Sequence, residues 1–209
     1  MNFDLMEIFT LVTGVIYIVL EIRQKNLMWI VGVATSLAAM WVFFRQGLYA
    51  SFGLNTYYLI TSFIGLWHWG RDKQKLGSGV AAKSKAGKEA KKKEQAKPAV
   101  HLNKMSWVTL AVSLAFMVAG TFGMAQVMEL LEDPMSYLDS AVTVMSIVAT
   151  WWLVRAYIQQ WWLWIVADAL STALCVQQGM WPMAALYAAY TVSAVIGYFY
   201  WKKNGKYIS

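Results

Sequence analysis

A single acidic residue, Asp168, stands inside a long apolar stretch in the C-terminal half of the sequence. The run 161–178 contains no other charged residue. A carboxylate at the centre of a bilayer-spanning helix costs roughly 2.5–3.5 kcal/mol on insertion scales, so it is expected to face a polar cavity or a partner. We interpret Asp168 as a ligand-binding residue. The alternative is a structural role, in which Asp168 only forms hydrogen bonds between helices.

Two tryptophans precede Asp168 at a spacing that places all three side chains on one helix face. Trp161, Trp164 and Asp168 are related as i, i+3 and i+7. Indole rings attract a desolvated cation, and a carboxylate supplies the countercharge, so the set suits a flat, cationic aromatic ligand. A second interpretation stays open, because tryptophans near a helix start also form the aromatic belt at a membrane surface. Trp162, on another face, is assigned to that belt.

Further polar residues lie in other apolar runs. Asn55 and Tyr58 are one turn apart, and a polar stripe follows Asp139 at helical spacing through residue 150. Each is explained equally well by interhelical hydrogen bonding, worth about 0.6 kcal/mol per contact. The candidate substrate-binding residues are Trp161, Trp164, Asp168, Asn55, Tyr58, Tyr187, Tyr190, Thr143 and Ser146.

Signatures of catalysis are missing from the sequence. There is no G-x-x-x-x-G-K-[ST] phosphate-binding loop and no Ser–His–Asp constellation. One cysteine and two histidines make a metal site unlikely to form. No lysine falls inside an apolar run, so a retinal Schiff base is excluded. We therefore expect no enzyme activity, no catalytic residues, no metal, no cofactor and no nucleic-acid partner.

The composition indicates an integral membrane protein. Hydrophobic residues make up 59% of the chain and charged residues 14%, against about 45–50% and 25% in soluble domains. Each apolar run is close to the roughly 20 residues that cross a bilayer as a helix. The runs are 5–22, 27–44, 48–69, 106–127, 138–157, 161–178 and 180–201. The first is interpreted as a retained helix, because Asp4 and Glu7 stand where a signal peptide is basic.

The charges divide the chain into segments and orient it. Residues 71–104 are basic and poor in large apolar groups, which predicts a mobile cytoplasmic loop. With that loop inside, the positive-inside rule places the N-terminus outside and the C-terminus in the cytoplasm. The segments expected are a three-helix unit (1–70), the basic loop (71–104), a linking helix (105–128), an external loop (129–137) and a second three-helix unit with a short tail (138–209).

The two three-helix units resemble each other in sequence. Tyr58, Gly65 and Trp69 match Tyr190, Gly197 and Trp201 at one offset, and Gln46-Gly47 matches Gln178-Gly179. Trp29-Ile30-Val31 is paired with Trp164-Ile165-Val166, shifted by three residues. One helix between the units makes the repeat parallel. The fold class expected is all-α, with seven transmembrane helices in a 3+1+3 parallel repeat and the ligand site near mid-membrane.

These motifs resemble the Pnu-type vitamin transporters, the PnuC nicotinamide riboside transporter family. The residues that carry the resemblance are Trp29-Ile30-Val31-Gly32, Gln46-Gly47-Leu48-Tyr49, Asn55-x-x-Tyr58, Trp161-x-x-Trp164-x-x-x-Asp168, Gly197 and Trp201. They cover both three-helix units and not the basic loop. In this family the tryptophan and Asn-x-x-Tyr motifs line the substrate site, which implies that role for Trp161, Trp164, Asn55 and Tyr58. The carriers often have Asn where this chain has Asp168.

The resemblance implies further properties. It implies a fold like that of the sugar-transporting SWEET proteins, a homotrimer in the bacterial inner membrane, and facilitated diffusion of a small vitamin. A cytoplasmic kinase would then trap the solute by phosphorylation. Nicotinamide riboside is the substrate expected, and thiamine, also an aromatic cation, is the alternative. A seven-helix receptor that binds a ligand without transporting it is the alternative from another class.

Overall fold

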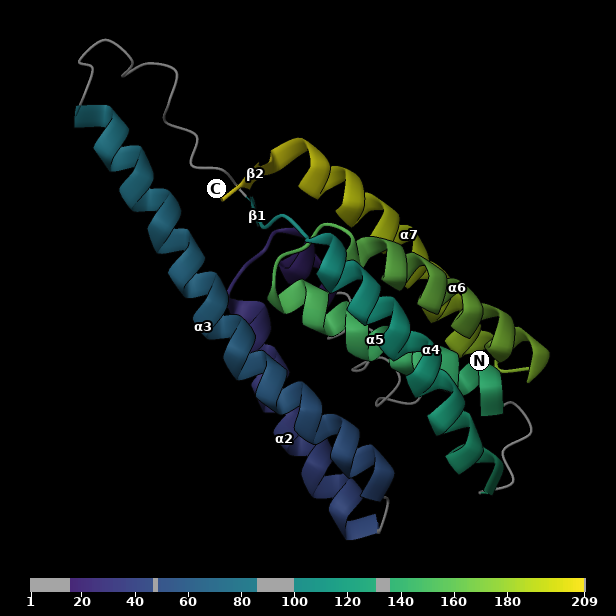
Figure 1. Cartoon of the computed structure of the whole chain (residues 1–209). Coiled ribbons are helices and arrows are strands. Elements are labelled where there is room, and N and C mark those ends of the chain that lie inside the picture. Colours follow the sequence, from purple (N-terminus) through teal and green to yellow (C-terminus); the bar gives the residue numbers. More distant parts are fainter. Residues whose placement is uncertain (1–15, 47–48, 86–99, 131–135, 209) are drawn as a thin grey trace. The chain divides into compact units, whose positions relative to one another are not determined.

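A computed structural model describes residues 16–46, 49–85, 100–130 and 136–208 of the chain (Figure 1). The chain divides into two compact units, which are considered separately. Unit 1 comprises Met1–Asn103, Val154–Ala156 and Lys203–Ser209. Unit 2 comprises Lys104–Leu153 and Tyr157–Lys202.

Helices form at the predicted apolar runs. They are α2 (Leu27–Gln46), α3 (Tyr49–Lys85), α4 (Trp107–Leu130), α5 (Ser136–Val154), α6 (Gln160–Gln177) and α7 (Trp181–Asn204). Residues 16–22 are also helical, and the start of that first run lies outside the described residues. Among the described helices, three are long and apolar enough to cross a membrane, at Trp107–Val127, Tyr137–Val154 and Met183–Asn204. The remaining spans stay predictions.

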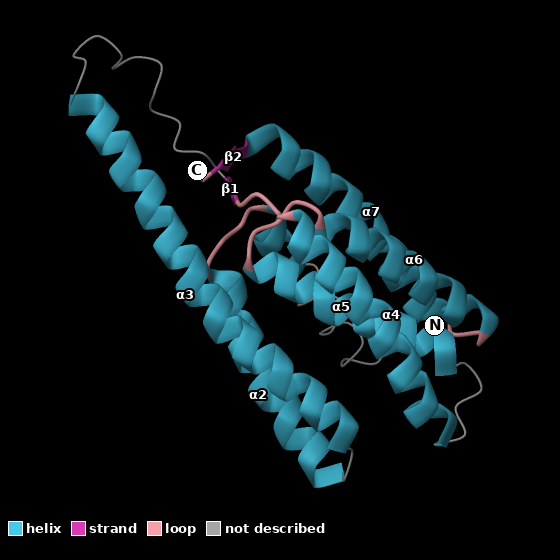
Figure 2. Cartoon of the chain, in the orientation of Figure 1, coloured by secondary structure: helices cyan, strands magenta, loops and turns pink. Residues whose placement is uncertain are grey.

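The predicted basic loop differs most from the structure. Helix α3 does not end near residue 69 but continues to Lys85 (Figure 2). Extending an existing helix avoids the cost of nucleation, and residues 71–85 include four Lys and two Ala, which favour helix. Charge had been taken as a sign of a loop, although a charged sequence can also propagate a helix. The central part of the loop, 86–99, lies outside the described residues.

Two short strands, which the sequence analysis did not predict, join the end of this segment to the C-terminal tail. Strand β1 (Val100–Leu102) pairs in parallel with β2 (Gly205–Tyr207) in unit 1. The N–H of Ile208 extends the pairing with a hydrogen bond of 2.8 Å to the carbonyl of Leu102. Three-residue strands are too short to show a period-2 pattern, which is why the expectation of an all-α fold missed them.

Unit 1 packs α2 on α3 through one indole. Trp29 is 1% exposed, and its ring meets the ring of Trp69 edge to face, with centroids 5.0 Å apart. A Cβ at Gly65 would lie 2.5 Å from the Trp29 ring, so only glycine leaves room for it. We refer to Trp29, Gly65 and Trp69 as the first indole cluster.

Unit 2 packs α6 on α7 in the same way. Trp161 is 2% exposed and meets the Trp201 ring edge to face at 5.4 Å. A Cβ at Gly197 would lie 2.4 Å from the Trp161 ring. Trp161, Gly197 and Trp201 form the second indole cluster. The two clusters are related by one offset, 132 residues (161 minus 29, 197 minus 65 and 201 minus 69).

The turns before α2 and α6 repeat at that offset as well. Gln24 and Ala156, 132 positions apart, both adopt the left-handed conformation, with φ of 48° and 53°. In each turn the following residue donates its N–H to the carbonyl five positions earlier, at 2.9 Å. The structure therefore aligns Trp29 with Trp161. The sequence pairing of Trp29 with Trp164 was wrong by three residues, because tryptophan recurs within α6.

Candidate functional site

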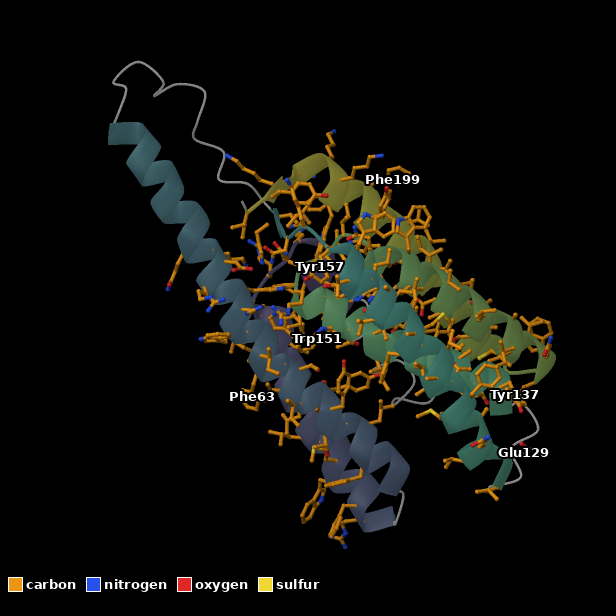
Figure 3. The ribbon with its side chains drawn as sticks, in the orientation of Figure 1. Phe63, Glu129, Tyr137, Trp151, Tyr157 and Phe199 are labelled. Atoms are coloured by element: carbon orange, nitrogen blue, oxygen red, sulfur yellow. The ribbon has the colours of Figure 1, made fainter. Side chains whose placement is uncertain are left out.

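Seven of the nine candidate residues lie in unit 2, on α5, α6 and α7. The Trp152 indole of α5 donates to Ser113 of α4 at 3.1 Å, and the second indole cluster joins α6 to α7. Asp139 of α5 lies within electrostatic range of Cys175 of α6. Figure 3 shows the side chains of these helices, with Tyr137 labelled near the start of α5 and Phe199 on α7. Phe199 is 60% exposed and so does not contribute to the interior.

Asp168 is the central polar residue of unit 2. It is 8% exposed, and among the described residues no side chain forms a hydrogen bond or ion pair with its carboxylate. Its backbone carbonyl accepts a bond of 2.7 Å from the hydroxyl of Thr172. The carboxylate lies within electrostatic range of the hydroxyls of Tyr187 and Tyr190 on α7. A buried carboxylate without a partner is costly, so a cationic ligand would stabilise it.

The two candidate tryptophans of α6, Trp161 and Trp164, have different environments. Trp161 is packed against Gly197 and Trp201, so its ring serves the helix–helix contact. Trp164 is half-buried, and its buried indole N–H has no partner among the described residues. Sequence spacing treated the two as equivalent stacking surfaces. Of these two candidates, Trp164 is the one whose ring lies outside the second indole cluster.

Helices α5 and α7 carry candidate hydroxyl groups that differ in whether they already donate a hydrogen bond. The rings of Tyr187 and Tyr190 meet edge to face at 6.1 Å, and both residues are half-buried. Ser146 donates to the carbonyl of Val142 at 2.8 Å, so its proton is already used within α5. Thr143 is half-buried beside it. The tyrosines are therefore better placed to donate to a ligand than Ser146 is.

Asn55 and Tyr58 belong to unit 1. Both are half-buried on α3, and the Tyr58 ring lies 5.7 Å from that of Tyr57. Tyr58 is also within electrostatic range of Tyr17. Within unit 2 the structure places Asp168 in electrostatic range of Tyr187 and Tyr190. The joining of all nine residues in one site stays a prediction.

The sequence analysis missed a glutamine at the start of α6. Gln160 has no exposed surface, and neither its side-chain oxygen nor its nitrogen has a hydrogen-bond partner among the described residues. The apolar run had been started at residue 161, which excluded Gln160. Its spacing of four to Trp164 and eight to Asp168 is the signal that could have included it.

Comparisons with known proteins identify the family. The sequence pattern of a family described as nicotinamide mononucleotide transporter matches residues 4–203. The chain belongs to this family. The nicotinamide riboside transporter PnuC of Escherichia coli K12 is 25% identical over 184 residues, which cover 79% of this chain and 71% of that protein. PnuC of Neisseria mucosa is 27% identical over 199 residues, covering 92% and 70%.

A solved structure shares the fold of this transporter-family chain. The crystal structure of the vitamin B3 transporter PnuC aligns with a TM-score of 0.62 and 23% sequence identity. The alignment covers 93% of this chain and 79% of the solved one. The chain is therefore a multi-pass, helical membrane protein of the transporter family, as the sequence resemblance predicted.

Proposed function

We propose that this protein is a facilitated-diffusion transporter that takes up nicotinamide riboside across the bacterial inner membrane. The observation that carries the proposal is the buried carboxylate of Asp168, which has no hydrogen-bond or ion-pair partner among the described residues. It lies within electrostatic range of two tyrosine hydroxyls on α7 and one turn from the indole of Trp164. The pyridinium ring of the riboside is flat and permanently cationic. Trp164 would stack on it, and Asp168 would offset part of the hydration that it loses.

The riboside fits the described residues better than the mononucleotide in the family description. A phosphate carries nearly two negative charges and is bound in proteins by Arg, Lys or helix N-termini. Between residues 105 and 201 the only basic residue is Arg155, which lies outside the helices. A phosphate beside Asp168 would add repulsion. The names of the PnuC relatives, which specify the riboside, agree with this choice.

Thiamine is the second candidate within the same class. It also carries a permanent charge on an aromatic ring, so Asp168 and Trp164 suit it as well. Its ring has no carboxamide and it carries no ribose. Competition between the two vitamins for the purified protein separates them.

Further features of the proposal rest on the family resemblance. They are seven spans with the N-terminus outside, a parallel repeat as in the SWEET proteins, a homotrimer, and trapping of the solute by a cytoplasmic kinase. The repeated indole clusters and turns support the repeat. Transport would proceed by rocking of the two three-helix units around a central site that includes Asn55 and Tyr58.

Uptake into liposomes tests the proposal. Purified protein reconstituted into vesicles should equilibrate radiolabelled nicotinamide riboside with the vesicle lumen, without an ion gradient. A receptor would retain only the amount that matches its own stoichiometry. Binding without uptake would therefore replace the transporter with a receptor, and uptake of thiamine alone would replace the substrate.

A further inference from the structure

The two units share a framework at the start of α2 and α6. The turns match in backbone conformation, and the indole clusters match in burial and in the tightness of the glycine contact. Positions in the two helices can therefore be compared directly at the 132-residue offset. A difference between them reflects what each helix must do beyond packing.

The differences fall along one line of α6. Gln160, Trp164 and Asp168 are spaced by four residues and form one ridge of the helix. At the same offset, α2 carries Met28, Gly32 and Ser36 (160 minus 28, 164 minus 32, 168 minus 36). All three positions are small or apolar in unit 1 and polar or aromatic in unit 2. We refer to Gln160, Trp164 and Asp168 as the recognition stripe.

Gln160 is the member of the stripe that packing does not explain. Met28 occupies the same position in unit 1 with no exposed surface, so an apolar side chain fills this place in the framework. Gln160 is equally buried, and its amide makes no hydrogen bond with any described residue. Burying an amide without a partner costs roughly 1–3 kcal/mol judged from mutations in proteins. A group that is retained at that cost requires a partner, and the described residues of the chain do not supply one.

The neighbouring polar atoms point to the same need. The indole N–H of Trp164, one turn along the stripe, is also buried and unpartnered among the described residues. One turn further, the buried carboxylate of Asp168 also has no hydrogen-bond or ion-pair partner in the part of the chain that the structure describes. The stripe therefore offers an amide donor and acceptor, an N–H donor and an anion in a row. The combination is complementary to an aromatic cation that carries a primary carboxamide.

We propose that Gln160 is a substrate-recognition residue, which pairs its side-chain amide with the carboxamide of the ligand while Trp164 and Asp168 hold the charged ring. This inference rests on the proposed function, since it assumes a ligand in unit 2. Trp161, which belongs to the shared framework, is then a positioning residue. Its packing against Gly197 fixes the rotation of α6 about its axis and so directs the stripe.

Calorimetric titration of purified Gln160→Met tests the inference. The variant carries the residue that unit 1 uses, so it should fold and melt at or above the wild-type temperature. Its affinity for nicotinamide riboside should fall roughly threefold to tenfold, as for the loss of one or two neutral hydrogen bonds. Its affinity for pyridinium riboside, the same cation without the carboxamide, should stay at the wild-type value. Gln160→Leu provides a second apolar variant, and Met28→Leu is the matched control in unit 1.

The outcomes separate this inference from the proposed function. Folded Gln160→Met with wild-type affinity for nicotinamide riboside would overturn it, and so would an equal loss for both ligands, which indicates a structural role. Neither result affects the proposed function, because the wild-type protein still binds. Wild-type protein that binds neither nicotinamide riboside nor thiamine would overturn the proposed function, and this inference with it.

Discussion

Helices α2 and α6 begin with the same turn and the same buried indole, yet they present different side chains two turns further on. Helix α2 approaches α3 closely: a Cβ at Gly32 would lie 2.7 Å from the hydroxyl oxygen of Ser62. Helix α6 carries Trp164 at the corresponding position. The first helix uses its ridge for contact with a neighbour. On the ridge of the second helix, an indole N–H and a carboxylate have no partner among the described residues. A shared framework with one altered ridge is how a repeat can bind an asymmetric ligand.

The comparison also shows which tryptophan does what. Trp29 and Trp161 stand at matched positions and each packs against a glycine. Packing alone explains this contact, because it also exists in unit 1, where there is no recognition stripe. Trp164 has glycine at the matched position of α2, so the shared packing does not explain it. By this reasoning Trp161 belongs to the framework and Trp164 to the ligand.

Replacing Asp168 is expected to have the largest effect on binding. Asp168→Asn keeps the shape and the hydrogen-bonding capacity but removes the charge. Affinity for nicotinamide riboside should fall about tenfold or more, the equivalent of roughly 1.5–3 kcal/mol for a contact with a charged group. Calorimetric titration of the purified variant measures this change.

The control for Asp168→Asn is Ser36→Ala, at the corresponding position of α2. It should leave the affinity unchanged. If Asp168 only holds helices together, Asp168→Asn would instead lower the melting temperature and leave the affinity of the folded protein at its wild-type value.

Alanine at the two cluster glycines should separate stability from binding. Gly65→Ala and Gly197→Ala each place a methyl group too close to an indole ring. Such overpacking lowers the free energy of unfolding by about 1–3 kcal/mol. Both variants should therefore melt several degrees lower. Only Gly197→Ala should also weaken binding, by a few fold, because it rotates the recognition stripe.

Melting curves and titrations on both glycine variants check this pair of expectations. Equal affinities in the two variants would mean that the position of Trp161 does not govern the stripe. Gly197→Ser should lower the melting temperature more than Gly197→Ala does. Its side chain is larger, and no described neighbour there offers a hydrogen-bond partner.

Much of the architecture could be predicted from the sequence, because a bilayer imposes a strong constraint. Apolar runs of about 20 residues have little choice but to be helices, and the described helices follow those runs. Gly179, predicted to end a helix, does so with φ of 72° after α6. Asp168 was found because a charge in an apolar run is conspicuous. The hydrophobic pattern was less informative in the basic segment that follows residue 69. Helix α3 continues about 16 residues beyond the predicted run (85 minus 69).

The rest depended on contacts that no local pattern carries. Trp161 and Trp164 look alike in spacing, and only the approach of Gly197 distinguishes them. Gln160 directly precedes the apolar run 161–178, and nothing in the sequence signals its complete burial. The parallel pairing of β1 with β2 joins residues about 100 positions apart (205 minus 100), far beyond any periodicity.

The smallest effect on binding is expected from a third difference, which lies between the two matched turns. Gln24 forms hydrogen bonds with its side-chain amide, whereas the methyl side chain of Ala156 can form none. Its amide donates to the carbonyl of His101 at 2.9 Å and accepts from the His101 N–H at 2.7 Å, which fixes strand β1 to the turn. The turn at Ala156 uses its backbone instead, since the carbonyl of Ala156 accepts a hydrogen bond of 3.2 Å from the N–H of Asn103.

The side chain of His101 lies buried beside the first indole cluster. It is 1% exposed and meets the Trp69 ring edge to face at 5.7 Å. Burial lowers the pKa of His101 to about 4. The Asp72 carboxylate, 3.7 Å away, opposes that shift, while Lys73 and His68 reinforce it. His101 is therefore neutral at pH 7 in the folded protein.

Acid should consequently destabilise unit 1 through His101. The unfolded chain, in which histidine has a pKa near 6.5, binds more protons than the folded chain between pH 6.5 and about 4. The free energy of unfolding is highest above pH 6.5 and falls as the pH drops through this window, by at most roughly 1.4 kcal/mol per pH unit. His101→Phe keeps the ring contact and cannot titrate, so its melting temperature should vary less between pH 7 and pH 5 than that of the wild type. Asp72 keeps its hydrogen bond from Asn103, at 3.1 Å, in this variant. Ligand affinity at pH 7 should be the same in both proteins, because the recognition stripe belongs to unit 2. An equal pH dependence of melting in the two proteins would assign the acid sensitivity to another group.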